Sequence, residues 1–227
     1  MFSEKIKKGM KIKLLGDSIT HGVGGTGFCQ NGEPIVEGYA RNKDGFCWAK
    51  MFSEYVWEKY GATVVNNACT GTRIEFVIQN FETLVDDEDD LFIVTIGTNN
   101  RHQHKKNAPK RTREDIGEEF YNYVITLNEL FIKKSKPFVF IANIPASAEN
   151  ERDKEDFWRI LHMDDINEIY KRAKASAGFS FVSMYDLFSE YLEKNGLALD
   201  SVLCDGLHPN DDGYKIMFKL IVEALGI

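Results

Sequence analysis

The chain contains little cysteine and no long apolar run, and each shortage excludes a class of protein. Its 227 residues include 4 cysteines, with no Cys-x-x-Cys spacing. Zinc knuckles and dense disulfide frameworks need more cysteines at more regular spacings. No segment approaches the length of a membrane span, and residues 1–9 carry charges where a signal peptide has its apolar stretch. We therefore expect a cytoplasmic protein that makes no membrane contact.

The chain also carries fewer positive than negative charges. The chain has 28 lysines and arginines against 35 aspartates and glutamates, which gives a net charge of −7. Nucleic-acid-binding surfaces normally carry a basic patch, so this balance argues against a nucleic-acid partner. Reduced structural thiols are the expected state of the cysteines, although export would permit a disulfide between Cys29 and Cys47.

Short apolar runs alternate with longer amphipathic runs along the chain. The apolar runs predict strands over residues 11–15, 63–68, 91–96, 138–142 and 179–183. The amphipathic runs predict helices over residues 46–60, 73–84, 113–134, 158–176, 185–194 and 210–225. This alternation is typical of a parallel sheet covered by helices on both faces. The length suits a single α/β domain over residues 1–227.

Residues suited to nucleophilic chemistry occur at both ends of the chain. Ser18 follows Gly16 and Asp17 at the end of the first predicted strand, and Asp205 precedes His208 by three residues near the C-terminus. Ligands of open α/β sheets bind beyond the carboxyl ends of strands. A carboxylate three residues before a histidine can hold the imidazole in one tautomer while its other nitrogen faces a serine. The pattern predicts a nucleophile, its base and an acid that orients the base.

Hydrogen-bond donors follow the next two predicted strands. Gly71 comes after the second strand, in the asparagine-rich segment 66–71, and Asn99 comes after the third. Acyl transfer develops negative charge on a carbonyl oxygen, which needs preorganised donors. A glycine offers its N–H without a blocking side chain, and an asparagine offers its amide N–H₂. With the N–H of Ser18, these groups would form an oxyanion site at one rim of the sheet.

Four segments together resemble the SGNH hydrolase superfamily, also called GDSL-type esterases and lipases. They are Gly16–Ser18, Gly71 with the asparagine-rich residues that precede it, Gly97–Asn99 and Asp205–Pro209. The resemblance implies an α/β fold: a three-layer α/β/α sandwich with a central, mostly parallel five-stranded sheet, the flavodoxin-like fold of this superfamily. It implies no cofactor and no metal.

The resemblance also implies a role for each matched residue. Ser18 is the nucleophile, His208 the general base and then acid, and Asp205 its partner. The oxyanion donors are Ser18, Gly71 and Asn99. The family often has aspartate after the asparagine of the third segment, whereas this chain has Asn100, so the bracing of Asn99 is left open.

The expected activity is two-step hydrolysis of a small-molecule or carbohydrate ester through an acyl-enzyme. O-acetyl groups of carbohydrates are the favoured substrates, because no long apolar lipid-docking stretch is evident. The alternatives are a lysophospholipase- or thioesterase-type hydrolase and a non-catalytic glycan-binding relative. Asp17, Trp48 and Trp158 are expected to contact substrate, and residues 146–158 to form a lid. The acyl chain length, the alcohol moiety and the oligomeric state are not predicted.

Other chemistries fit the sequence less well. Residues 22–27 match a dinucleotide fingerprint, but they lie several residues after the strand and no helix is predicted to follow. No Gly-x-Ser-x-Gly elbow of an ordinary α/β-hydrolase is present. His102 and His104 lie in a basic segment, 101–111, that we expect to be an exposed loop rather than a metal site.

Overall fold

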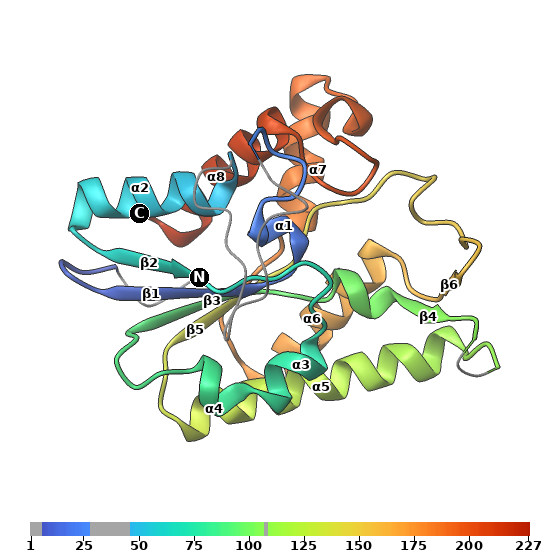
Figure 1. Cartoon of the computed structure of the whole chain (residues 1–227), viewed down its shortest axis with the longest axis horizontal. Coiled ribbons are helices and arrows are strands. Elements are labelled where there is room, and N and C mark those ends of the chain that lie inside the picture. Colours follow the sequence, from blue (N-terminus) through green and yellow to red (C-terminus); the bar gives the residue numbers. More distant parts are fainter. Residues whose placement is uncertain (1–5, 28–45, 107–108) are drawn as a thin grey trace.

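A central sheet organises the computed structural model of the chain, which describes residues 6–27, 46–106 and 109–227. Its strands are β1 (Lys11–Gly16), β2 (Thr63–Asn66), β3 (Leu91–Thr95), β5 (Phe138–Ile141) and β7 (Phe181–Val182). They lie in the order β2-β1-β3-β5-β7, and every neighbouring pair is parallel (Figure 1). The predicted three-layer fold with a five-stranded sheet is confirmed, and the main sheet is parallel throughout.

Helices cover both faces of this sheet (Figure 1). One layer contains α1 (Ser18–His21), α2 (Trp48–Tyr60), α7 (Met184–Asn195) and α8 (Asp211–Leu225). The other contains α3 (Ile74–Gln79), α4 (Phe81–Leu84), α5 (Arg113–Lys133) and α6 (Met163–Ala177). Among the helices in the described ranges, none combines the length and the apolar composition needed to cross a bilayer.

The central strand β3 shows why the sheet is sandwiched. Its five residues are all buried, and successive side chains of a strand point to opposite faces. Leu91 and Ile93 therefore join the core beneath α2, α7 and α8, while Phe92 and Val94 join the core beneath α5 and α6. A strand buried on both faces reads as a continuous apolar run, as the sequence indicated.

Two predicted helices differ from those in the structure. Residues 157–159 form a strand, β6 (Phe157–Arg159), which pairs with β4 (His102–His104), so α6 begins only at Met163. Strands of three residues are too short to show a two-residue period. The helix predicted over 73–84 is interrupted at Asn80, whose side-chain amide donates to the Phe76 carbonyl at 2.8 Å. Such local side-chain bonds compete with helix continuation.

Gly16 ends β1 at a position that leaves no room for a side chain. A Cβ at this position would meet the Thr95 hydroxyl and lie 2.8 Å from the Cβ of Thr20. The hydroxyls of Thr20 and Thr95 are themselves in direct contact. The absence of a side chain at Gly16 therefore lets the turn carrying residues 17–20 pack against β3.

The Gly16→Ala variant should be destabilised by about 1–3 kcal/mol, because an added methyl group forces its neighbours apart. Displacement of the adjacent turn should also lower any esterase activity. Gly117→Ala is the matched control: its Cβ would lie 3.7 Å from the nearest atom, Cδ1 of Ile169, and alanine favours the helix. Urea denaturation of both variants measures the difference, and equal midpoints would contradict the crowding at Gly16.

Candidate active site

Ser18, His208 and Asp205 form a continuous hydrogen-bonded series. The Ser18 Oγ lies 2.8 Å from Nε2 of His208, and Nδ1 of His208 lies 2.7 Å from Oδ2 of Asp205. An ionised carboxylate only accepts hydrogen bonds, so Nδ1 carries the proton and Nε2 is left to accept from the serine. The series can therefore withdraw a proton from Ser18 while that oxygen attacks an electrophile.

Asp205 is oriented by the turn in which it lies. Its Oδ1 accepts from the N–H groups of Leu207 and His208, at 3.0 and 2.8 Å. Gly206 takes a left-handed conformation, with φ of 79°, that allows this tight turn. Burial opposes ionisation, but the hydrogen bonds from His208 and Leu207 outweigh it and lower the pKa of Asp205. The carboxylate therefore stays ionised at neutral pH and able to hold the imidazole.

Ser18 is the first residue of α1, and Asp17 caps this helix. The Asp17 carboxyl accepts from the N–H of Ile19 at 3.1 Å and from the Asn143 side chain at 2.9 Å, and it also bonds to the Thr98 hydroxyl. Asp17 is fully buried, and this burial raises the pKa of its carboxyl. The expectation that Asp17 contacts substrate is wrong, because its side chain is enclosed between strand ends and has no accessible surface.

Hydrogen bonds between loops bring Gly71 and Asn99 to the same rim as Ser18. The Asn99 side chain donates to the Thr72 carbonyl at 3.0 Å, and the N–H of Cys69 donates to the Gly16 carbonyl at 3.1 Å. Thr72 thus supplies the brace on Asn99 that the sequence left open. One Nδ2 hydrogen of Asn99 is engaged by this carbonyl, which fixes the amide plane and leaves the second hydrogen for a ligand.

The side chain of Asn100 makes different contacts from that of Asn99. Its side chain is buried, accepts from the N–H of Ile74 at 3.2 Å and donates to Glu75 at 2.6 Å. It therefore anchors the start of α3 behind the loop that carries Gly71. In the described part of the chain, the N–H groups of Ser18 and Gly71 donate to no protein acceptor. Their roles as oxyanion donors remain predictions.

The two tryptophans expected to contact substrate have different positions. Trp48 is fully buried at the start of α2 and packs against Phe52, with ring centroids 6.1 Å apart. The expectation for Trp48 is wrong, because its large ring fills the core. Trp158 is half-buried in β6, opposite Gln103, and its proposed contact with substrate remains a prediction. Cys29 lies outside the described residues, so its pairing with Cys47 is untested.

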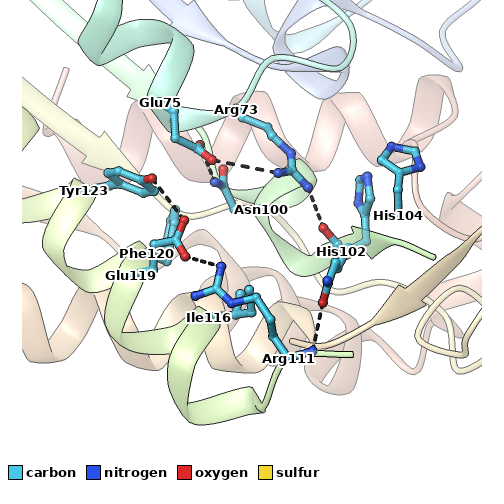
Figure 2. A pocket seen from close by; sticks show the side chains of 11 residues that line it. Arg73, Glu75, Asn100, His102, His104, Arg111, Ile116, Glu119, Phe120 and Tyr123 are labelled. Carbon is cyan, nitrogen blue, oxygen red and sulfur yellow. Dashed lines mark hydrogen bonds and ion pairs between the residues drawn. The ribbon is translucent and has the colours of Figure 1, made fainter. Parts of the chain in front are cut away.

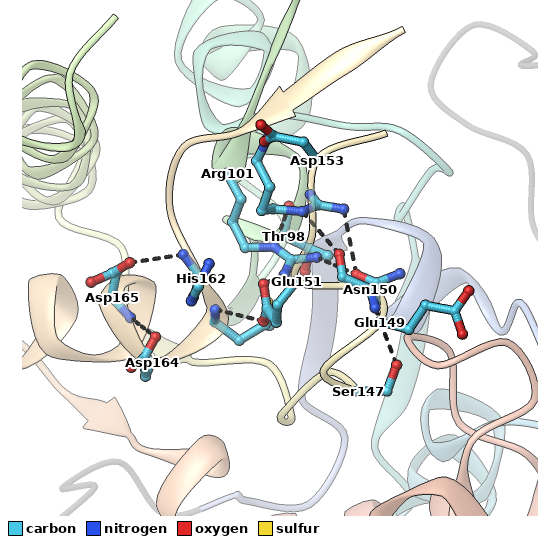
Figure 3. Close-up of polar contacts among 12 residues, drawn as sticks. Thr98, Arg101, Ser147, Glu149, Asn150, Glu151, Asp153, His162, Asp164 and Asp165 are labelled. Carbon is cyan, nitrogen blue, oxygen red and sulfur yellow. Dashed lines mark hydrogen bonds and ion pairs between the residues drawn. The ribbon is translucent and has the colours of Figure 1, made fainter. Parts of the chain in front are cut away.

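Arg101 is a functional candidate that the sequence did not single out. It lies in the segment expected to be an exposed basic loop, yet its side chain is fully buried. Nε donates to the Thr98 carbonyl at 3.0 Å (Figure 3). Nη1 donates to Glu151 at 2.7 Å, and Nη2 to the Asn150 side chain at 3.2 Å. The guanidinium therefore joins the end of β3 to the loop that follows β5.

This loop is fixed at further points. The second carboxylate oxygen of Glu151 accepts from the N–H of Met163 at 3.0 Å, at the start of α6. The N–H of Ser147 donates to the Gly206 carbonyl at 2.8 Å, in the turn between Asp205 and His208. These contacts do not favour the expectation that residues 146–158 form a lid, because they tie the loop both to the segment after β3 and to the turn that carries Asp205 and His208.

A separate pocket of about 140 Å³ contains His102 (Figure 2). Arg73 donates to the His102 carbonyl, and Arg111 pairs with Glu119 across the pocket. Burial lowers the pKa of His102 to about 3, with the charges of Arg73 and Arg159 adding to the effect. The described residues contain no group of three or more side chains suited to holding a metal ion.

His102 should make the stability of the protein depend on pH. Its pKa is about 3 in the folded chain and 6.5 when unperturbed, so the unfolded chain binds more protons between these values. The contribution of His102 to stability is complete above pH 6.5 and is lost as the pH falls toward 3. The His102→Gln variant should therefore lose less stability than the wild type between pH 6.5 and 4 in urea titrations. Parallel curves for the two proteins would contradict a neutral, half-buried His102.

Both the sequence and the fold of the chain are similar to those of known proteins. The model of the GDSL-like lipase/acylhydrolase family matches residues 14–216. No curated protein sequence matches the chain. Among solved structures, Axe2, an acetylxylan esterase from Geobacillus stearothermophilus, is 21% identical, with a TM-score of 0.68 over 99% of this chain and 97% of that chain.

Two further solved structures have a similar fold. A mutant of Axe2, an acetyl-xylooligosaccharide esterase, reaches a TM-score of 0.72 at 20% identity, covering 99% of this chain and 97% of that one. A GDSL-like lipase from Parabacteroides merdae has a TM-score of 0.68 at 18% identity, over 98% of each chain. At these identities the likeness is one of fold.

Proposed function

Because the chain belongs to the GDSL-like lipase/acylhydrolase family and is a serine esterase, we propose that it hydrolyses short-chain acyl esters, in particular O-acetyl groups of carbohydrates. The observation that carries the proposal is the continuous series from Ser18 through His208 to Asp205. These distances preorganise the three groups for proton transfer.

In the proposed reaction, the Ser18 Oγ attacks the ester carbonyl while Nε2 of His208 takes its proton. The tetrahedral intermediate places its negative oxygen near the N–H groups of Ser18 and Gly71 and the amide of Asn99. His208 then protonates the departing alcohol, leaving an acyl group on Ser18. Water, deprotonated by the same imidazole, attacks this acyl-enzyme, and release of the acid restores the Ser18 hydroxyl.

The preference for acetylated carbohydrates has two supports, the first of which concerns the sugar part of the ester. The loop after β5 and the turn around Asp205 present mainly polar side chains beside the acid–base pair, as a sugar ester requires. Axe2, whose fold this chain shares, is described as an acetylxylan esterase. A glycan-binding protein without catalysis would not need an ionised carboxylate, an imidazole and a hydroxyl at hydrogen-bonding distances, so the enzyme is favoured over that alternative.

Removal of the nucleophile should abolish activity. The Ser18→Ala variant should lose detectable cleavage of p-nitrophenyl acetate and labelling by a fluorophosphonate probe, because no acyl-enzyme can form. Ser189→Ala, which removes a hydroxyl that donates to the Tyr185 carbonyl within α7, is the matched control and should keep full activity. Circular dichroism checks that both variants fold. Undiminished turnover by a folded Ser18→Ala protein would refute the proposed mechanism.

Asn99 should contribute through the transition state. The Asn99→Ala variant removes one oxyanion donor and should lower kcat by about 10²- to 10³-fold, with a smaller change in KM. The measurement is steady-state kinetics with p-nitrophenyl acetate, and thermal unfolding serves as the check on folding. A loss below about tenfold would assign Asn99 to bracing the Thr72 loop instead of binding the oxyanion.

A further inference from the structure

A cavity of about 460 Å³ lies beside the turn that carries Asp205 and His208, and the mechanism above assigns no ligand to it. Residues 147–150 and 154, in the loop after β5, form one wall. Residues 200 and 203–206 form the other, so Asp205 belongs to the cavity wall. The Asp205 carboxylate is one imidazole ring away from the reacting hydroxyl of Ser18. We refer to this cavity as the Asp205 pocket.

The Asp205 pocket is lined mainly by polar side chains of several kinds. They include Ser147, Glu149, Asn150, Lys154 and Asp200, besides Asp205 itself. Three carboxylates therefore face one ammonium group, and the surroundings carry an excess of negative charge. Ala148, Leu203 and Cys204 are the less polar residues of the lining, too few to bury an acyl chain.

Asn150 is held in a fixed orientation at the wall of this pocket. Its side-chain oxygen accepts from Arg101 at 3.2 Å (Figure 3) and from Arg159 at 3.4 Å. Its backbone carbonyl accepts from Nε of Arg159 at 3.1 Å, and its N–H donates to the Ser147 hydroxyl at 3.2 Å. Because Arg101 and Arg159 are both buried, the oxygen end of the amide is committed to the protein. The two N–H donors of Asn150 are therefore left for a ligand.

Unused acceptors complement these donors. Within the described ranges, the carboxylates of Glu149 and Asp200 make no hydrogen bond or ion pair with the protein. They lie on opposite walls of the Asp205 pocket, one on the loop after β5 and the other in η2 (Leu199–Val202). A group that enters between them would meet carboxylates on both sides and the Asn150 donors on one.

We propose that the Asp205 pocket is a subsite for an uncharged sugar on the alcohol side of the ester, an inference that rests on the proposed function. A sugar hydroxyl donates to a carboxylate and accepts from an amide, so neighbouring hydroxyls can use both kinds of group in this lining. The excess of carboxylates disfavours a phosphate or a uronic acid in the same place. This subsite therefore selects neutral glycosides over lysophospholipids and acidic sugars.

The bonds of Arg101 explain why the subsite exists before substrate arrives. Through Glu151 and Asn150, the buried guanidinium fixes the loop wall of the pocket, and the bond from Ser147 to Gly206 sets its distance from the opposite wall. A binding site held in this way needs little ordering when a ligand enters, so more of each new hydrogen bond contributes to affinity.

The test compares two double variants on two esters. Glu149→Gln/Asp200→Asn removes both unused carboxylate charges of the pocket. Glu155→Gln/Asp156→Asn removes two exposed charges outside the pocket lining and is the matched control. The substrates are mono-O-acetylated maltotriose and p-nitrophenyl acetate, which has no sugar to occupy the pocket.

For the pocket variant, KM for acetylated maltotriose should rise about 5- to 30-fold, because two charge-assisted hydrogen bonds become neutral ones. Its kcat/KM for p-nitrophenyl acetate should stay within about twofold, as should both values for the control variant. The wild type should also prefer acetylated maltotriose to acetylated trigalacturonic acid, and the pocket variant should narrow that preference.

Each outcome is decisive. A pocket variant that is unchanged on both esters, or equally impaired on both, would overturn the subsite, as would a wild-type preference for the acidic trisaccharide. These results leave the proposed function intact as long as p-nitrophenyl acetate is cleaved and cleavage depends on Ser18. If the wild type shows no such Ser18-dependent cleavage, the proposed function itself fails.

Discussion

The buried carboxyl group of Asp17 connects the ends of three neighbouring strands, and the geometry of the candidate site depends on it. Asp17 follows β1, Thr98 follows β3 and Asn143 follows β5, and the side chains of the last two bond to the Asp17 carboxyl. Asn143 also donates to the Thr98 hydroxyl at 2.5 Å. The same carboxyl caps the helix that begins with Ser18. The position of the serine is thereby coupled to that of Asn99, the next residue after Thr98.

A second set of bonds acts farther from the sheet. Arg101 joins the end of β3 to the loop after β5, and Ser147 joins that loop to Gly206 in the acid–base turn. The two sets complement each other, since the first fixes the serine and the second supports the turn that carries the histidine. Buried ion pairs such as the one between Arg101 and Glu151 are expensive to desolvate, so their value here is positional rather than a large gain in stability.

The fold and the series from Ser18 through His208 to Asp205 could be predicted from the sequence, because both depend on local patterns. Apolar runs mark the strands, and the residues that follow parallel strands meet at one edge of the sheet. The environment of a side chain could not be predicted where residues distant in the sequence determine it. Trp48 and Asp17 were expected to contact substrate, yet core packing buries the first and hydrogen bonds between strand ends bury the second. Arg101 resembled its exposed basic neighbours, because nothing in its own segment indicates that Glu151 will pair with it. The strand β6 was missed because its partner β4 lies over fifty residues earlier.

The turn from Asp205 to His208 is self-contained in a way that the serine is not. The carboxylate bonds to the ring of His208 and to two backbone amides within three residues of itself, so this geometry is encoded in one short peptide. Insertions outside this turn and the loop after β5 that supports it would leave the pair of Asp205 and His208 undisturbed and would alter only its approach to the Ser18 hydroxyl. The reactivity of the site should therefore be most sensitive to changes in the segments that position Ser18 against this pair.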